Sequence, residues 1–260
     1  MTTGVRKTGD FCWINILTPD PAGSRDFFGR LLGWTFDDLS GMGDLIKVDG
    51  QQIGGMFDLN SPQTPPGTPP VIGVMVKVDS ADAMAEKVRS LGGKAEAPMD
   101  VMENGRMVMC HDTSGANIDL WQPKNEAGMT ADASHHGAPS WFENYSTDIP
   151  KSTEFYTKLF GWKPEVMHMP GMDYTTFKLD GVEMPIGGMM ALTPDMGKDV
   201  PPHWATYFTV DDADKTAAKA TELGGNVVVG PLDIPDVGRF AGIMSPQGVM
   251  FLVIKYTPRE

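Results

Sequence analysis

The sequence predicts an α+β fold built from four modules, each made of one strand, one helix and three further strands. Two observations carry this prediction. The phrase WINILTPDPAGSRDFFGRLLGW at 13–34 returns 128 residues later, at 141–162, as WFENYSTDIPKSTEFYTKLFGW. Each half also contains a second helical stretch that stops at Leu-Gly-Gly, at 91–93 and 223–225. The chain is therefore a repeat of two halves, and each half is itself a pair of modules.

The first module opens with a predicted strand at 11–17. Alternation divides its side chains between two faces, with Trp13, Asn15 and Leu17 on one and Cys12, Ile14 and Ile16 on the other. Asp20 is expected to cap a helix that starts at Pro21 and ends at Gly33, because proline costs nothing at the first helical position and glycine favours the end. Strands at 35–39, 44–48 and 51–57 follow, and residues 1–8 resemble a disordered leader.

The second module follows a proline-rich loop at 61–70, which cannot be a central strand. It predicts a strand at 71–78, a helix capped by Ser80 that stops at Gly92-Gly93, and strands at 94–97, 106–110 and 117–122. The second half repeats this plan with a few extra loop residues, so Gly238-Arg239 corresponds to Gly105-Arg106.

Charge and composition exclude several classes of function. With 34 acidic and 21 basic residues among 260, the formal charge is −13, which disfavours nucleic acid and anionic membranes as partners. Cys12 and Cys110 are the only cysteines, and the sequence contains neither a secretory leader nor a run long enough to span a bilayer. We expect a cytoplasmic protein that binds a small organic ligand, as a monomer or weak dimer.

These features resemble the vicinal oxygen chelate superfamily, which includes glyoxalase I, bleomycin-resistance proteins and extradiol dioxygenases. The resemblance is carried by Asp148, Phe155-Tyr156, LFGW at 159–162, the paired Leu-Gly-Gly and Gly-Arg motifs, and SPQG at 245–248. It is similar to the tandem glyoxalase-like proteins of actinobacteria, sometimes called hydroxylases or 27 kDa antigens. It implies that the modules pair into two cup-shaped curved sheets.

The resemblance covers residues 9–257 and implies two glyoxalase-like domains. The first would occupy 9–123, with modules at 9–60 and 71–123. A linker would follow at 124–137. The second domain would occupy 138–257, with modules at 138–192 and 202–257.

The resemblance also implies where a divalent ion would bind in each cup. Relatives place metal ligands on the opening strand of a module and on its last strand, where His, Glu or Asp would be needed. The corresponding positions here are Trp13, Gly73 and Asp119 in the first half and Trp141, Ala205 and Leu252 in the second. Only Asp119 among these could bind a metal, so no metal cofactor is expected, although a divalent ion stays possible.

Neighbouring residues supply the remaining candidates. Glu143 should share a strand face with Trp141 and Tyr145, and His203 should point the same way as Ala205. Glu143 and His203 could act as an acid and base couple, or as residual metal ligands with Asp119. Equally, Glu143 could form hydrogen bonds inside the cup while His203 caps its strand.

The other candidates are ligand-binding residues. A cup lined by aromatic side chains favours a flat organic ligand, unless the same side chains fill it; the lining residues would be Trp13, Asn15, Trp141, Tyr145 and Tyr207. Arg106 and Arg239 would pair with acids or, alternatively, meet an anionic group of a ligand.

Three functions are compatible with the sequence. The first is a protein that binds a small molecule without a metal, for detoxification or for resistance to or modification of a secondary metabolite. The second is a metal-dependent glyoxalase-type lyase or extradiol-type dioxygenase using Glu143, His203 or Asp119. The third is a non-enzymatic scaffold for protein partners.

Overall fold

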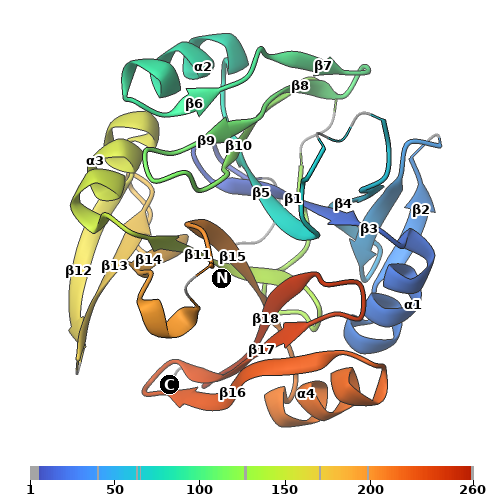
Figure 1. Ribbon diagram of the computed structural model, residues 1–260. Coiled ribbons are helices and arrows are strands. Elements are labelled where there is room, and N and C mark those ends of the chain that lie inside the picture. The colour runs from blue at the N-terminus through green and yellow to red at the C-terminus, as the bar shows by residue number, and fades with distance from the viewer. Residues whose placement is uncertain are drawn as a thin grey trace.

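Two curved, eight-stranded sheets organise the chain (Figure 1). The computed structural model describes residues 6–39, 41–62, 64, 66–125, 128–169, 171–197 and 199–258. The sheet of the first half has the order β2-β3-β4-β1-β5-β10-β8-β7, and the sheet of the second half has the order β12-β13-β14-β11-β15-β18-β17-β16. The order is the same in both halves, which confirms the predicted repeat of four modules and the α+β fold class.

The elements of the first half are β1 (Phe11–Thr18), α1 (Pro21–Leu32), β2 (Thr35–Asp38), β3 (Asp44–Val48), β4 (Gln51–Asp58), β5 (Val71–Lys77), α2 (Ala81–Ser90), β6 (Lys94–Ala95), β7 (Met99–Val101), β8 (Gly105–Val108), β9 (Cys110–His111) and β10 (Asp119–Pro123). Those of the second half are β11 (Pro139–Ser146), α3 (Ile149–Phe160), β12 (Lys163–Met169), β13 (Met172–Lys178), β14 (Gly187–Ala191), a short 3-10 turn (Pro194–Met196), β15 (His203–Thr209), α4 (Ala213–Glu222), β16 (Asn226–Ile234), β17 (Gly238–Met244) and β18 (Met250–Tyr256).

The modules pair within each half through their opening strands. β1 lies antiparallel to β5, and β11 lies antiparallel to β15. The two consecutive modules of each half therefore build one continuous sheet.

The helices begin and end at the residues that the sequence predicts. The Asp20 carboxyl accepts a hydrogen bond from the Gly23 amide, and α1 ends at Gly33 with a φ of 69°. Asp148 accepts from the Lys151 amide at the start of α3, and Ser80 accepts from the Ala83 amide at the start of α2. These bonds satisfy amides that have no partner inside the helix.

Three local expectations are wrong. Cys12 packs on the same side as Trp13, because the register shifts between Phe11 and Trp13 and the bulge breaks simple alternation. The strand predicted at 106–110 is split into β8 and β9, with an additional short strand, β7, before it. Within the leader predicted at 1–8, Arg6 is buried and forms an ion pair with Asp10; residues 1–5 lie outside the described ranges.

One hydrophobic core joins the two halves. Phe11 of β1 stacks on Phe142 of β11 with ring centroids 4.2 Å apart, and Trp34 meets Phe208 edge-on at 5.2 Å. The Tyr156 hydroxyl of α3 donates to Asp112 Oδ2 in the first half at 2.7 Å, and it accepts from Trp204 Nε1 at 2.9 Å. The halves are therefore held together by both apolar and buried polar contacts.

The helices in the described part of the chain are all too short or too polar to cross a lipid bilayer.

Replacing Tyr156 with Phe should destabilise the protein through this buried link. The change leaves Asp112 Oδ2 and Trp204 Nε1 without their mutual partner, and leaving buried groups unsatisfied costs about 1–3 kcal/mol. Urea unfolding measures the loss, and Tyr256→Phe is the matched control because that residue is only partly buried. An equal loss in the two variants would contradict the proposed importance of the Tyr156 link.

Candidate functional site

The concave faces of the two sheets are the parts of the fold available for function. We call the concave face of the β2–β7 sheet the first cup and that of the β12–β16 sheet the second cup. Along β1, Ile14 and Ile16 are fully buried in the core, whereas Trp13 and Asn15 on the other face stay partly exposed. The core covers one face of each sheet. On the other face Trp13 and Trp141 stay partly exposed, whereas Met75 and Trp121 in the first cup and Tyr207 and Leu252 in the second are buried in small clusters of their own.

A carboxyl group lies at the centre of the second cup. Glu143 of β11 is 5% exposed, and three tyrosine hydroxyls donate hydrogen bonds to it. Tyr145 and Tyr207 each donate to Oε2 at 2.7 Å, and Tyr174 donates to Oε1 at 2.6 Å. The three donors compensate a buried acidic group that would otherwise be costly.

Trp141 and a glycine position the third tyrosine. Trp141 Nε1 donates to the Tyr174 hydroxyl at 2.9 Å, so the ring nitrogen supports the donor that reaches Glu143. A Cβ at Gly188 of β14 would lie 2.1 Å from the Tyr174 hydroxyl oxygen. Only glycine at this position leaves room for the contact between β13 and β11.

His203 lies at the edge of the same group. Its ring stacks on Tyr145 with centroids 4.8 Å apart, and its Nδ1 lies 2.8 Å from the Pro201 carbonyl oxygen. A carbonyl only accepts, so Nδ1 carries the proton and Nε2 presents a lone pair. Burial lowers the pKa of His203, which favours this neutral form.

We refer to Glu143, Trp141, Tyr145, Tyr174, Tyr207 and His203 as the Glu143 cluster. Burial, followed by the nearby Glu143 charge, raises the pKa of all three tyrosines in it. The hydroxyls therefore remain protonated and act as neutral donors to the carboxylate. The expected hydrogen bonding of Glu143 inside the cup and the position of His203 at the start of β15 are both observed.

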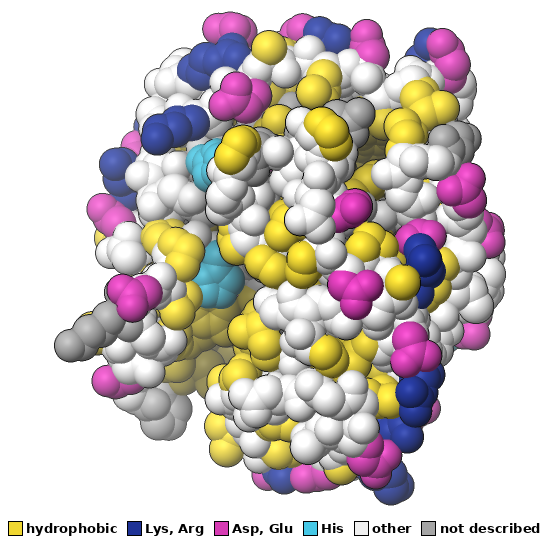
Figure 2. Space-filling view, turned by 45° about the vertical axis from the view of Figure 1, so that its right-hand side comes forward, with side chains coloured by type: hydrophobic (Ala, Val, Ile, Leu, Met, Phe, Trp, Pro, Cys, Tyr) yellow, Lys and Arg dark blue, Asp and Glu magenta, His cyan; other side chains and the backbone are white. Residues whose placement is uncertain are grey.

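Apolar walls surround the cluster. Towards β12 and β14, the cross-strand neighbours of two cluster tyrosines are methionines. Met167 of β12 pairs with Tyr174, and Met190 of β14 pairs with Tyr145. On the β16–β17 side, Leu232 pairs with Phe240, which packs against Tyr207. Met167 is 49% exposed and Leu232 is 52% exposed. Figure 2 shows a hollow on the molecular surface with mainly hydrophobic walls and a histidine at its edge.

The first cup has different chemistry at the matching positions. Trp13 Nε1 donates to Asn15 Oδ1 at 3.0 Å, and Asn15 Nδ2 contacts Met75 Sδ at 3.4 Å. Asn15 and Met75 thus occupy the places of Glu143 and Tyr207. Trp121 and Met107 complete a mainly apolar lining.

Asp119 is the acidic group of the first cup. It is 7% exposed, and its Oδ1 accepts from the Cys110 amide at 3.1 Å and from Asn117 Nδ2 at 2.9 Å. Burial raises its pKa to about 6, although both hydrogen bonds act in the opposite direction. It pairs with Met75 of β5, in the first sheet, whereas Glu143 belongs to the second.

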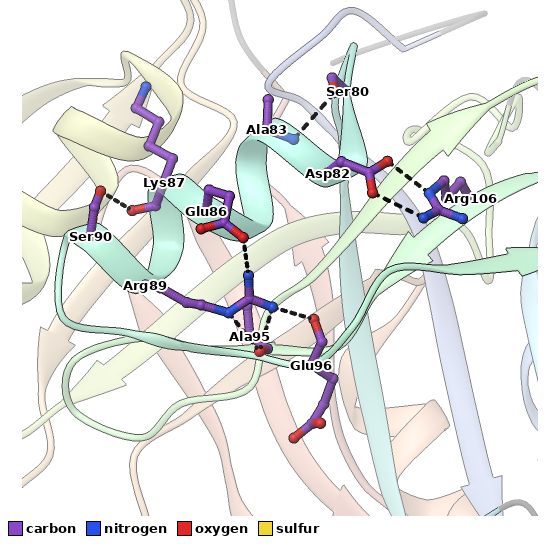
Figure 3. A network of polar contacts seen from close by, with 10 residues as sticks. All are labelled: Ser80, Asp82, Ala83, Glu86, Lys87, Arg89, Ser90, Ala95, Glu96 and Arg106. Atoms are coloured by element: carbon purple, nitrogen blue, oxygen red, sulfur yellow. Dashed lines mark hydrogen bonds and ion pairs between the residues drawn. The ribbon is translucent and has the colours of Figure 1, made fainter.

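Arg106 and Arg239 lie outside both cups. Arg106 forms two hydrogen bonds to the Asp82 carboxylate of α2 and one to Asp100, as Figure 3 shows for Asp82. Arg239 repeats this arrangement with Asp214 of α4 and with Asp233. The expected pairing with acids is thus observed, on the helix-covered faces, and neither guanidinium is brought to the Glu143 cluster.

Two surface depressions of about 340 and 410 Å³ lie elsewhere, over Phe160 and over Tyr256 respectively. Residues of the Glu143 cluster line neither of them. Salt-paired surface side chains such as Arg239 and Asp233 form part of the second, and they are a weaker basis for specific binding than the second cup.

The donor set of the cups does not fit a divalent ion. Among the described residues, no three His, Cys, Asp or Glu side chains come together in a metal-binding arrangement. Glu143 and His203 share the second sheet while Asp119 belongs to the first, so the three candidate ligands cannot form one site. Each Glu143 oxygen already accepts from at least one neutral tyrosine hydroxyl, and the raised pKa values of these hydroxyls make them poor metal ligands.

Tyr174 is the member of the cluster that sequence reasoning missed. It lies on β13, away from the opening and closing strands of the modules, where the resemblance places metal ligands. One signal could have indicated it, because all five tyrosines of the chain lie in the second half, between residues 145 and 256. The unequal distribution shows that the two halves have diverged in their use of tyrosine.

Comparisons with known proteins agree with this fold. The profile of the Glyoxalase/Bleomycin resistance protein/Dioxygenase superfamily matches residues 11–120 and 139–253. The chain is 34% identical over 255 residues to the putative glyoxylase CFP32 of Mycobacterium tuberculosis, covering 95% of each protein. It is 30% identical over 263 residues to the anthracycline biosynthesis protein DnrV of Streptomyces peucetius, covering 94% of this chain and 92% of that protein.

Solved structures with the same fold are more distant in sequence. The 2,3-dioxygenase LapB from Pseudomonas sp. KL28 aligns with a TM-score of 0.65 at 15% identity, covering 100% of this chain and 96% of that one. The Mn(II)-bound glyoxalase from Novosphingobium aromaticivorans aligns with a TM-score of 0.67 at 14% identity, covering 98% and 83%. At these identities the likeness establishes the fold alone.

The hydrogen bonds of the cluster predict which tyrosine contributes more to the free energy of unfolding. Tyr174→Phe removes the donor to Oε1 and also the acceptor of Trp141 Nε1, so it should cost about 1–3 kcal/mol of unfolding free energy. Tyr145→Phe leaves Oε2 with the Tyr207 hydroxyl, so a loss of about 0.5–1.5 kcal/mol is expected. Urea unfolding of the two variants measures both, and a larger loss for Tyr145→Phe would overturn the proposed arrangement.

Proposed function

The chain belongs to the Glyoxalase/Bleomycin resistance protein/Dioxygenase superfamily, and from this premise we propose that it binds a small, flat organic molecule in its second cup without a metal ion. The observation that carries the proposal is the Glu143 cluster, a buried carboxyl held by three tyrosines on an otherwise apolar concave face. Such a combination of apolar walls and a few convergent polar groups is typical of small-molecule sites.

The apolar walls support a flat and largely apolar ligand. Met167 and Leu232 stay about half exposed on opposite sides of the cup, and a ligand between them would remove that surface from water. Methionine side chains adapt to irregular shapes, and aromatic rings such as Trp141 and Phe240 stack on flat molecules. The relative named for anthracycline biosynthesis supports a role with a secondary metabolite, in its modification or detoxification.

A pair of matched substitutions tests which cup binds. Ala205 lies opposite Glu143 in the second cup, and Gly73 lies opposite Asn15 in the first. Ala205→Leu should fill the second cup and weaken binding of a naphthalene-type probe at least about tenfold. Gly73→Leu should leave that affinity unchanged, because Gly73 belongs to the other sheet. A Cβ at Gly73 meets its nearest neighbour at 3.6 Å, so the first atom of the new side chain fits. Equilibrium dialysis with 2-naphthol measures both affinities.

Circular dichroism and thermal unfolding control for the integrity of the two variants. If Gly73→Leu abolished binding while Ala205→Leu did not, the first cup would be the site. If neither substitution changed binding, the ligand would lie outside both cups.

The alternative is a metal-dependent lyase or dioxygenase, of the kind represented by the Mn(II)-bound glyoxalase. An ion bound only by the folded protein at 100 times its dissociation constant stabilises it by about 2.7 kcal/mol. Adding Mn²⁺ or Zn²⁺ to chelator-treated protein should leave the unfolding temperature unchanged, because no three metal-ligating side chains among the described residues come together. A rise that disappears in Glu143→Gln would instead support the metal-dependent alternative.

A further inference from the structure

The hydrogen-bond polarity of the second cup restricts the chemistry of its ligand. Every side-chain N–H and O–H of the Glu143 cluster is already directed at an acceptor. Tyr145, Tyr174 and Tyr207 donate to Glu143, Trp141 donates to Tyr174, and His203 Nδ1 donates to the Pro201 carbonyl. The remaining capacity of the cluster consists of lone pairs on phenolic oxygens, on Glu143 and on His203 Nε2.

From this polarity we propose that the second cup selects a neutral aromatic molecule with a hydroxyl or N–H group, and rejects oxyanions and carboxylates. The inference rests on the proposed function, because it specifies the ligand of the same cup. A hydrogen-bond donor on the ligand meets a group of acceptors, whereas a ligand acceptor meets lone pairs and is repelled.

The charge of the site strengthens this selection. Glu143 is 5% exposed, and interactions with its charge are stronger there than in water because the surrounding medium is less polarisable. Lys178, which shares the face of Tyr174 on β13, is ion-paired with Glu165, and the Arg106 and Arg239 guanidinium groups are bound to carboxylates on the opposite faces of their sheets. The formal charge of −13 disfavours anionic ligands further.

A hydroxyl group of the ligand can also donate a hydrogen bond directly to Glu143. A ligand hydroxyl that takes the place of Tyr145 or Tyr207 at Glu143 Oε2 would release a tyrosine O–H, which could then donate to the ligand oxygen. An ether in the same position offers no hydrogen to Oε2, and covering a polar group without a partner is costly. The cup therefore distinguishes an alcohol from its methyl ether.

The test compares three ligands of nearly equal shape on the wild-type protein, by equilibrium dialysis at neutral pH. These are 2-naphthol, which carries a donor, 2-methoxynaphthalene, which lacks it, and 2-naphthoate, which is an anion. We expect 2-naphthol to bind at least about tenfold more tightly than 2-methoxynaphthalene, with 2-naphthoate weakest. Equal or tighter binding of the ether or the carboxylate would overturn the inference.

Two variants separate failure of this inference from failure of the proposed function. Glu143→Gln introduces donors into the cluster, so the ratio of the affinities for 2-naphthol and 2-naphthoate should fall at least about tenfold; an unchanged ratio would count against the role of Glu143.

Ala205→Leu should weaken the binding of 2-naphthol and of 2-methoxynaphthalene alike. If 2-naphthol and 2-methoxynaphthalene bound equally, and both were lost in Ala205→Leu, the site would stand and its proposed selectivity would fall. If the wild-type protein bound none of the three, the proposed function itself would fall.

Discussion

The antiparallel pairing of opening strands, β1 with β5 and β11 with β15, is the constraint on which the structure depends. Each pair forms the centre of its sheet and joins two modules into one curved surface. Since side chains alternate along a strand, Ile14 and Phe142 must enter the shared core if Asn15 and Glu143 face the cups. A slip of one residue would exchange the two sets, so the core holds the functional face in place.

This constraint explains why the fold was predictable from the sequence. Core positions repeat between the halves, as Trp34 and Trp162 do, and the caps Asp20 and Asp148 mark the same helix starts. Local rules therefore located the four helices. They failed where the backbone departs from regular alternation, as in the bulge that turns Cys12 towards Trp13.

The site was predictable only in part, for a different physical reason. Glu143, Tyr145 and Tyr207 lie on central strands whose faces follow from alternation. Tyr174 reaches Glu143 from β13, two strands away, and the contact exists because Gly188 on the intervening β14 has no side chain. Such a contact depends on sheet order and on the space above a glycine, and a single sequence encodes neither in a local pattern.

The differences between the cups follow from the same architecture. Since the buried face fixes the fold, the concave face is free to change, and the halves have diverged there: Asn15 against Glu143, Met75 against Tyr207, and Leu17 against Tyr145. A buried carboxyl is costly unless donors accompany it, and Glu143 has three tyrosine hydroxyls as donors. The first cup has no tyrosine, and its own acid, Asp119, is stabilised by a backbone amide and Asn117 instead. Each cup thus carries a buried acid with its own donors, and the identity of those donors determines what polarity is left beside that acid for a ligand.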